Sequence, residues 1–359
     1  MQITGPGTKM KLQARLSLAQ NWSPVLAQEA SETFYLLPEW LELISRLYGY
    51  KLFPLEVRNE AGQLCAFLPL CLVQNRPGSQ RLVAFPFSDY CPLLAESPEH
   101  AQTLVDQALA LAGEYKAACL ELRCGPNAWL QARGDFVVSD LYVRWILPLA
   151  GDAQAMWSRL RKPVQRQIRK ATQLGVQVRL AERREEMLSY YQLHLRTRCK
   201  KHGLPAQPKR FFLELWDTFA SSGRLRLWLA EYEGKPIAGM IFLAAGSVLR
   251  YAYGASHERY LQLAPNNLLM WQAIKQACDE GFKVLDLGRT ACANQGLMEF
   301  KRRWGAERIP LPYYYYPRQA GPVSTSEESR VYRWLTGCWR WLPLPVSGPL
   351  GGLLYRYLG

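Results

Sequence analysis

The chain has few acidic residues, few histidines and no paired cysteine motif. Its 30 Asp and Glu residues face 44 Lys and Arg residues, so its formal net charge is +14. Four scattered histidines and nine scattered cysteines, with no CxxC, offer no spacing that could bind zinc. The sequence therefore predicts no metal site. Cys91 and Cys119 stand in apolar surroundings and are expected in the core, which suits a reducing cytoplasm.

Long apolar runs are also missing. No uninterrupted apolar run approaches the roughly 20 residues that span a bilayer, and no apolar segment follows Lys9 and Lys11. We therefore expect a cytoplasmic protein that is either soluble or peripheral on a membrane. The excess of positive charge attracts phosphates, nucleic acid or an anionic membrane without choosing among them.

One order of elements is predicted twice along the chain: strand, tight turn, strand, strand, helix, strand, helix. A further helix is expected before each repeat, at 38–47 and at 185–201. The first repeat is expected to hold strands 54–58, 64–73, 81–87 and 118–123 with helices 100–113 and 126–133. The second is expected to hold strands 225–232, 236–245, 248–255 and 283–288, helices 265–279 and 296–304, and a last strand 309–316. A meander that feeds one helix and a parallel return strand is the order of the GNAT (N-acetyltransferase) fold.

The fold class expected is therefore α/β (α+β), with tandem GNAT-like domains, each a mixed twisted sheet flanked by helices. Residues 1–150 are expected to form an N-terminal scaffold domain and 151–317 a catalytic domain. Residues 318–359 are expected to form a linker, rich in Pro, Ser and Gly over 317–329, and a tail rich in Trp and Arg.

Acyl transfer to an amine needs a bound donor, a stabilised oxyanion and a route for the amine proton. Asp286 ends a buried strand, where it could orient or deprotonate an amine, and Tyr253 could return a proton to a leaving group. Lys301 could reach a phosphate or the oxyanion, and Arg289 an anionic substrate. The alternatives are an Asp–Arg pair that holds a loop, a solvated basic helix face, and a packed tyrosine.

Backbone N–H groups at the start of the helix predicted over 265–279 could hold an anion, with Pro265, Asn266 and Asn267 as the candidate donor-binding residues. Either asparagine could equally be a structural N-cap. Earlier in the sequence than this helix, basic helical stretches contain three candidate substrate-binding residues, Lys162, Arg166 and Arg198. Cations at a helix end also stabilise its dipole, so a structural role stays open.

Taken together, these segments resemble the FemAB-type proteins, a branch of the GNAT superfamily. The resemblance covers most of the chain and is strongest over 162–316. Its carriers are Lys162…Arg166…Arg169-Lys170-Ala171, Gly203-Leu204-Pro205, Tyr251-Ala252-Tyr253-Gly254-Ala255, Pro265-Asn266-Asn267-Leu268-Leu269, Asp286-Leu287-Gly288-Arg289-Thr290 and Phe300-Lys301-Arg302-Arg303-Trp304-Gly305. The segment 85–90 also looks like relatives associated with the PEP-CTERM and exosortase systems.

This resemblance implies an N-acyl or aminoacyl transferase that modifies an amine of a phosphate-bearing cell-envelope or exopolysaccharide precursor. Acyl-CoA or aminoacyl-tRNA would be its co-substrate, with no tightly bound cofactor. The family position of Lys301 and Arg289 lies near substrate phosphates. The glycine-rich CoA loop typical of GNAT folds is missing, since 261–267 reads LQLAPNN. A catalytically inactive GNAT-fold binding component of an envelope polysaccharide assembly system is therefore the alternative.

Residues 331–359 combine tryptophans, arginines and leucines, with prolines that prevent one continuous helix. Such a tail suits a peripheral contact with the cytoplasmic face of the inner membrane, and equally suits packing against the second domain. Nucleic-acid binding suggested by charge alone would be driven by phosphate contacts and sensitive to salt.

Overall fold

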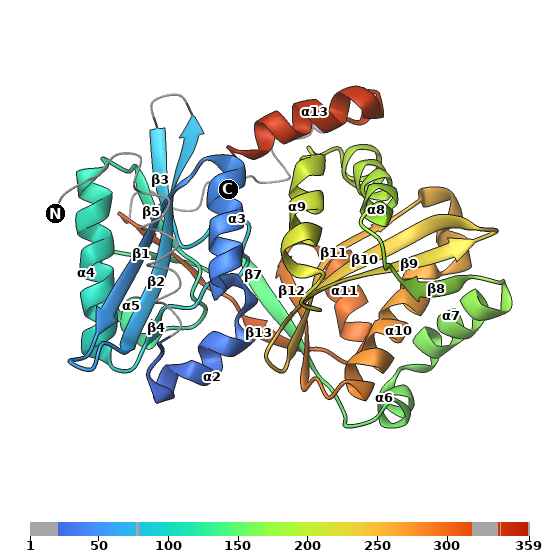
Figure 1. Ribbon diagram of the computed structural model, residues 1–359, viewed down its shortest axis with the longest axis horizontal. Helices are drawn as coiled ribbons and strands as arrows, with labels where there is room; N and C mark the ends of the chain where they lie inside the picture. Colours follow the sequence, from blue (N-terminus) through green and yellow to red (C-terminus); the bar gives the residue numbers. More distant parts are fainter. Residues whose placement is uncertain (1–20, 77–78, 318–336, 338, 358–359) are drawn as a thin grey trace. The chain divides into compact units, whose positions relative to one another are not determined.

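The structure is a computed structural model that describes residues 21–76, 79–317, 337 and 339–357 (Figure 1). It divides into two compact units. The first contains the residues up to Ser139 together with 312–317, and the second contains 140–311 together with the described part of 337–357. Each unit is built around its own mixed sheet.

The first unit has a sheet in the order β1-β2-β3-β5-β14-β6, with β4 paired to β2. Helices α3 and α4 lie on opposite faces of this sheet (Figure 1). The strands are β1 (Lys51–Arg58), β2 (Leu64–Arg76), β3 (Ser79–Val83), β4 (Leu94–Ala95), β5 (Cys119–Leu122), β6 (Val137–Ser139) and β14 (Tyr313–Tyr316). The helices are α2 (Pro24–Glu32), a 3-10 turn (Phe34–Leu36), α3 (Pro38–Tyr48), α4 (Pro98–Glu114) and α5 (Ala128–Ala132).

The second unit has a sheet in the order β13-β7-β12-β11-β10-β9-β8. Its strands are β7 (Tyr142–Pro148), β8 (Gln177–Leu180), β9 (Leu225–Tyr232), β10 (Lys235–Ala245), β11 (Val248–Ser256), β12 (Val284–Ala291) and β13 (Glu307–Pro310). Its helices are α6 (Ala153–Arg159), α7 (Lys162–Gln173), α8 (Glu186–Leu195) continued by a π-helix (Arg196–Lys201), α9 (Lys209–Phe219), a 3-10 segment (Glu258–Leu263), α10 (Pro265–Asp279), α11 (Gln295–Arg303) and α13 (Leu344–Tyr355).

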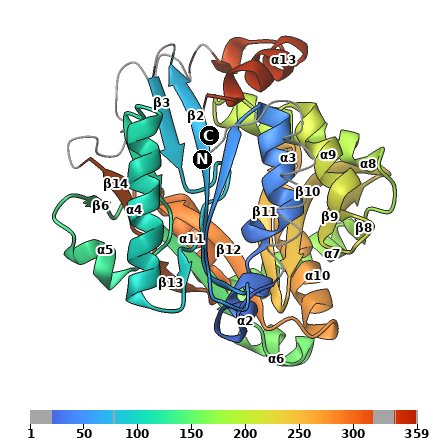
Figure 2. The same ribbon diagram turned by 60° about the vertical axis from the view of Figure 1, so that its left-hand side comes forward.

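Two helical layers cover the sheet of the second unit (Figure 2). Helices α8 and α9 cover one face, while α6, α7 and α10 pack together against the other. Val164 and Ile168 of α7 join Leu269 and Ile274 of α10 in one buried apolar cluster with the sheet. This burial, and not the polar sequence of α7, is what holds that basic helix in place.

The structure confirms the repeat. In each unit three consecutive strands form an antiparallel meander, and the third strand pairs in parallel with the strand that follows the long helix. Both parallel ladders have three residue pairs, 81–83 with 119–121 and 248–250 with 284–286. Two units with one strand order confirm the expected tandem GNAT-like α/β fold.

The last strand of each repeat joins the other unit's sheet. Strand β7 follows the first repeat but pairs with β12 and β13, and β14 follows the second repeat but pairs with β5 and β6. The single strand expected over 309–316 is therefore two strands, separated at Leu311–Pro312. For the same reason the boundary lies at 139/140 and not at 150, and 312–317 leave the expected domain 151–317.

The expected linker at 317–329 lies outside the described residues, apart from Pro317. Within the expected tail, helix α13 packs against α8 and the π-helix of the second unit. No helix in the described part of the chain is long and apolar enough to cross a membrane.

Candidate functional site

The sheet of the second unit opens between two of its central strands. Strands β11 and β12 pair in parallel only up to Arg250 and Asp286. Beyond that pair, β11 continues to Ser256 along β10, and β12 continues to Ala291 along β7. The first residues of α10 follow the end of β11, so a helix N-terminus stands at the carboxyl ends of the strands. In open α/β sheets, ligands bind in such places.

Asp286 lies at this point, but inside the protein. Its carboxylate is completely buried and lies 2.7 Å from the guanidinium groups of both Arg144 and Arg250. It also accepts a 2.7 Å hydrogen bond from the backbone N–H of Gly288. These contacts agree with the alternative of an Asp–Arg pair that holds the strand end.

The first unit repeats this arrangement. Glu121 occupies the last pair of its parallel ladder, is 4% exposed, and lies 3.0 Å from Arg81 and 2.7 Å from Arg123. A buried acid between two arginines is therefore a property of the repeat. It stabilises the place where each sheet opens, because a buried carboxylate needs charged or N–H partners.

Lys301 is buried on α11 at 3% exposure. Its ammonium donates hydrogen bonds to the backbone carbonyls of Gly288, at 3.1 Å, and Arg289, at 3.0 Å. It does not line the pocket described next. The expectation that Lys301 reaches a phosphate or the oxyanion is therefore not met at this pocket, because its ammonium is turned to these carbonyls.

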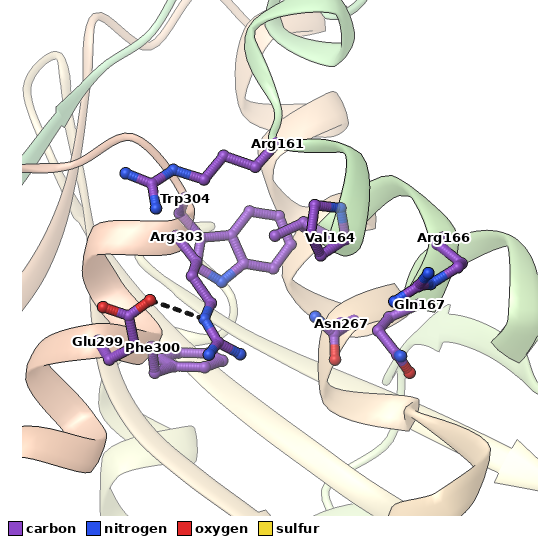
Figure 3. A pocket seen from close by; sticks show the side chains of 10 residues that line it. Arg161, Val164, Arg166, Gln167, Asn267, Glu299, Phe300, Arg303 and Trp304 are labelled. Atoms are coloured by element: carbon purple, nitrogen blue, oxygen red, sulfur yellow. Dashed lines mark hydrogen bonds and ion pairs between the residues drawn. The ribbon is translucent and has the colours of Figure 1, made fainter.

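A pocket of about 600 Å³ lies between the start of α7, the start of α10 and the helix α11 (Figure 3). Its lining combines arginines with two aromatic rings: Arg161, Pro163, Val164, Arg166, Gln167, Asn267, Glu299, Phe300, Arg303 and Trp304. Arg303 and Asn267 flank the opening from α11 and α10. The pocket can accept an anionic group at the N-terminus of α10, with a flat apolar wall beside it.

Glu299 is the acidic residue among those that line this pocket. Its carboxylate accepts hydrogen bonds from Arg303, at 2.9 Å, and Arg302, at 2.7 Å. The pKa of Glu299 is lowered, mainly by these two hydrogen bonds. A carboxylate held in this way is a weak general base, so it balances arginine charge more readily than it takes a proton.

The structure corrects the expected helix cap at the pocket. The N-cap of α10 is Ala264, which has a positive φ of 54°, and Pro265 is the first helical residue. The side-chain amide of Asn266 donates a 3.4 Å hydrogen bond to the hydroxyl of Ser256. Of the three predicted donor-binding residues, Asn267 is the one whose side chain lines the pocket.

Helix α7 presents a basic surface along the pocket. Lys162 and Arg166 are both exposed, and Arg166 lines the pocket with Arg161. One turn further, a shallower groove of about 280 Å³ is lined by Trp157, Trp271 and Arg169, with Ile168, Thr172, Gln173, Leu268 and Gln272. The Arg169 guanidinium lies 5.4 Å from the centre of the Trp157 ring.

Arg198 and Arg289 lie elsewhere. The Nε of Arg198 donates a 3.2 Å hydrogen bond to the carbonyl of Pro205, and the Arg289 guanidinium lies 4.3 Å from the centre of the Tyr142 ring. Both act electrostatically on the phenol of Tyr355 in α13, whose pKa burial raises. Of the predicted substrate-binding residues, Arg166 therefore lines the pocket, and Arg198 and Arg289 do not.

Tyr253 lies in an aromatic cluster, with ring centres 5.8 Å from Phe211 and 5.5 Å from Phe212. The side chain of Tyr251, two residues away, is half-buried, and removal of water from its hydroxyl raises its pKa to about 12. A Cβ added to Gly254 would lie 1.9 Å from the Tyr251 hydroxyl, so a larger residue at 254 would require the Tyr251 ring to move. The strand pairing skips one residue between Tyr251 and Tyr253. This β-bulge changes the direction of the side chains along the strand, so the two rings need not lie on the same face.

The sequence prediction missed Arg161, Glu299, Phe300, Arg303 and Trp304 as pocket residues. Helical spacing could have indicated the last three, because positions 300, 303 and 304 share one face of a helix and 301 lies off it. No group of His, Cys, Asp and Glu in the described residues could hold a metal ion.

Residues 158–302 match the family model of the acetyltransferase (GNAT) domain. Among curated proteins, the lipid II:glycine glycyltransferase of Staphylococcus haemolyticus (strain JCSC1435) is 31% identical over 117 residues, which are 28% of this chain and 28% of that protein. The enzyme of the same name from Staphylococcus epidermidis (strain ATCC 35984) is 29% identical over 124 residues, 30% of each chain. The match thus spans less than a third of the length of these relatives.

Solved structures share the fold over much more of the chain. The crystal structure of FemX matches with a TM-score of 0.64 at 16% identity, over 89% of this chain and 97% of that chain. The structure of L-PGS from Bacillus licheniformis matches with a TM-score of 0.57 at 11% identity, over 100% of this chain and 98% of that chain. At these identities the similarities show a shared fold over most of the chain.

Proposed function

We propose that this chain is an aminoacyltransferase that uses aminoacyl-tRNA as donor and an amine of a phosphate-bearing cell-envelope precursor as acceptor. The observation that carries this proposal is the pocket at the start of α10, where Arg161, Arg166 and Arg303 surround a helix N-terminus. In a GNAT fold the donor lies at the start of the central helix, and α10 is that helix here. The relatives named as glycyltransferases and the GNAT domain match support the reaction class.

The surface beside the pocket favours a polynucleotide over a small donor. The basic side chains of α7 can bind a phosphate backbone, and Trp157 and Trp271 at the adjoining groove can stack on bases. The segment that leads into α10 has no glycine-rich loop for a pyrophosphate. Acyl-CoA, the second possible co-substrate, would use the pocket but not the aromatic groove.

The reaction needs no tightly bound cofactor. The acceptor amine attacks the carbonyl carbon of the aminoacyl ester, a C–N bond forms, and the ester C–O bond breaks. The released tRNA hydroxyl takes a proton, and the amine loses one. Because the pocket carboxylate of Glu299 is held by two arginines, we assign most of the rate increase to positioning of the two substrates.

For the acceptor, we propose a cell-wall precursor or its exopolysaccharide counterpart. Arg198 and Arg289, the two cations near Tyr355, are the residues that we assign to its anionic part. Asp286 and Lys301 keep the end of β12 in place and act on the substrate only through that strand.

The test uses the purified full chain with a mixture of aminoacyl-tRNAs that carry labelled amino acids, and with amine-bearing lipid-linked and nucleotide-linked precursors. Transfer of label to a precursor is the expected result. A parallel reaction with labelled acyl-CoA decides between the donors. Transfer from acyl-CoA without any transfer or binding of tRNA would contradict the donor that we propose.

The alternative is a binding component without activity. It is favoured by one observation, that the carboxylate in the pocket is held by arginines and is a poor base. Tight binding of a precursor together with failure to bind any aminoacyl-tRNA or acyl-CoA would support it.

A further inference from the structure

The inner face of helix α13 consists of three small residues and Tyr355. Ser347, Gly348 and Gly351 are buried against the second unit. A Cβ added to Gly351 would lie 2.9 Å from the backbone N and O atoms of Ala206, closer than real side chains approach. The helix therefore packs closely against the backbone at Ala206, and any larger residue at 351 would displace it.

The turn before α13 is tied to the same surface. The ammonium of Lys200, on the π-helix, donates hydrogen bonds of 2.8 Å to the carbonyls of Arg340 and Leu342. These contacts leave the opposite face of α13 pointing to solvent.

That outer face is apolar. Val346, Leu350, Leu353 and Leu354 follow each other at helical spacing and are 37–62% exposed, while Trp341, just before the helix, is 88% exposed. A helix on a water-facing surface normally carries its apolar residues inward and its polar residues outward. In α13 three small residues and Tyr355 face the protein, while Val346 and the leucines at 350, 353 and 354 face out, which indicates that something other than water covers those four side chains.

The charged residues near this outer apolar face of α13 indicate which kind of surface covers it. Residues 330–359 include four arginines, at 330, 333, 340 and 356, and no Asp or Glu. The described ones, Arg340 and Arg356, are exposed at the two ends of the helical segment. A second copy of the chain would bring like charges together, whereas an anionic lipid surface would pair with both arginines and take up Trp341 with the other apolar side chains below its headgroups.

We propose that α13 docks on an anionic lipid bilayer, lying in the plane of the interface with Trp341, Val346, Leu350, Leu353 and Leu354 among the lipid chains. Twelve residues make a helix of about 18 Å, too short to span the roughly 30 Å hydrocarbon core. This surface is separate from the donor pocket and does not depend on which donor is used. It would hold the enzyme where a lipid-linked acceptor lies.

The first test is sedimentation of the full chain with vesicles of phosphatidylglycerol and phosphatidylcholine, or of phosphatidylcholine alone. The double variant Leu350→Glu/Leu353→Glu should bind the anionic vesicles at least roughly tenfold more weakly than the unchanged protein. The matched control is Leu174→Glu/Leu261→Glu, which places the same charges at two leucines that are 43% and 40% exposed on the same unit. Thermal melts show whether both variants remain folded.

Two further measurements test the depth of Trp341 in the bilayer and the role of the two arginines separately. Brominated lipids should quench the unchanged protein more than Trp341→Phe, because Trp341 would lie at the depth of the lipid chains. Arg340→Gln/Arg356→Gln should lose the preference for anionic vesicles. Equal binding by the leucine variant and its control would overturn the proposal. A different result would assign the outer face of α13 to a second copy of the chain instead. In that case the unchanged protein would bind no vesicles but would self-associate without lipid, and Leu350→Glu/Leu353→Glu would abolish the self-association.

Discussion

The carboxylate of Asp286 on β12 lies 2.7 Å from the guanidinium of Arg144 on β7, although 142 residues separate them in the sequence. Arg144 belongs to the strand that the first repeat contributes to the second sheet, and Arg250 of β11 contacts the same carboxylate oxygen. One buried acid thus joins the three strands at the point where the sheet opens.

Replacing Asp286 by Ala should destabilise the protein by about 3–5 kcal/mol, because Arg250 would keep a buried charge without its carboxylate. Asp286→Asn should cost less, since the amide oxygen can still accept from the N–H of Gly288. Denaturant unfolding measures both. A variant with unchanged stability but no transfer activity would show instead that Asp286 takes part in the reaction.

Lys301→Met should leave the carbonyls of Gly288 and Arg289 without their donor and destabilise the protein by roughly 2–4 kcal/mol. Donor binding by the folded fraction should change little, because Lys301 does not line the pocket. Urea unfolding and filter binding of tRNA give the two numbers. Weaker binding at full stability would make Lys301 an anion ligand after all.

Arg166→Ala and Arg303→Ala should each weaken donor binding roughly 10- to 100-fold, which corresponds to a lost charge-assisted hydrogen bond. If the donor is tRNA, each should also reduce the slope of log affinity against log salt by about one unit. The control is Arg210→Ala, an exposed arginine of α9 that pairs with Glu214 on its own helix. Equal binding by all three variants would exclude the pocket as the donor site.

The buried His194 should make stability depend on pH. Burial, with repulsion from Arg198, lowers its pKa to about 3, and its Nε2 lies 2.8 Å from the Gln207 side-chain oxygen. The unfolded chain, with a usual histidine pKa of about 6.5, binds the proton more tightly. The stability is therefore complete above pH 6.5 and is lost as the pH falls toward 3, by roughly 1.4 kcal/mol per pH unit.

Urea unfolding at pH 7 and pH 5 tests this, with His194→Gln as the comparison. The unchanged protein should lose about 2 kcal/mol more than the variant between these pH values. The same loss in both proteins would assign the acid sensitivity to other groups.

Local patterns in the sequence were sufficient for most elements. Strand β9 and helix α10 lie over 225–232 and 265–279 as predicted, because alternation, helical periodicity and the proline at the helix start are properties of neighbouring residues. The repeat followed from the same patterns. The N-cap of α10 was less predictable, since it is an alanine with a positive φ and makes no side-chain hydrogen bond to the helix.

The sequence by itself determined the two α/β repeats, the excess of positive charge and the helix whose N-terminus meets the basic pocket. Only the tertiary structure decided which cations face that pocket. Lys301 and Arg303 are two residues apart on one helix, yet one is bonded to carbonyls in the interior and the other lines the opening. The exchange of β7 and β14 was likewise decided by strand pairing over long separations, where the hydrogen bonds join residues that no local pattern connects.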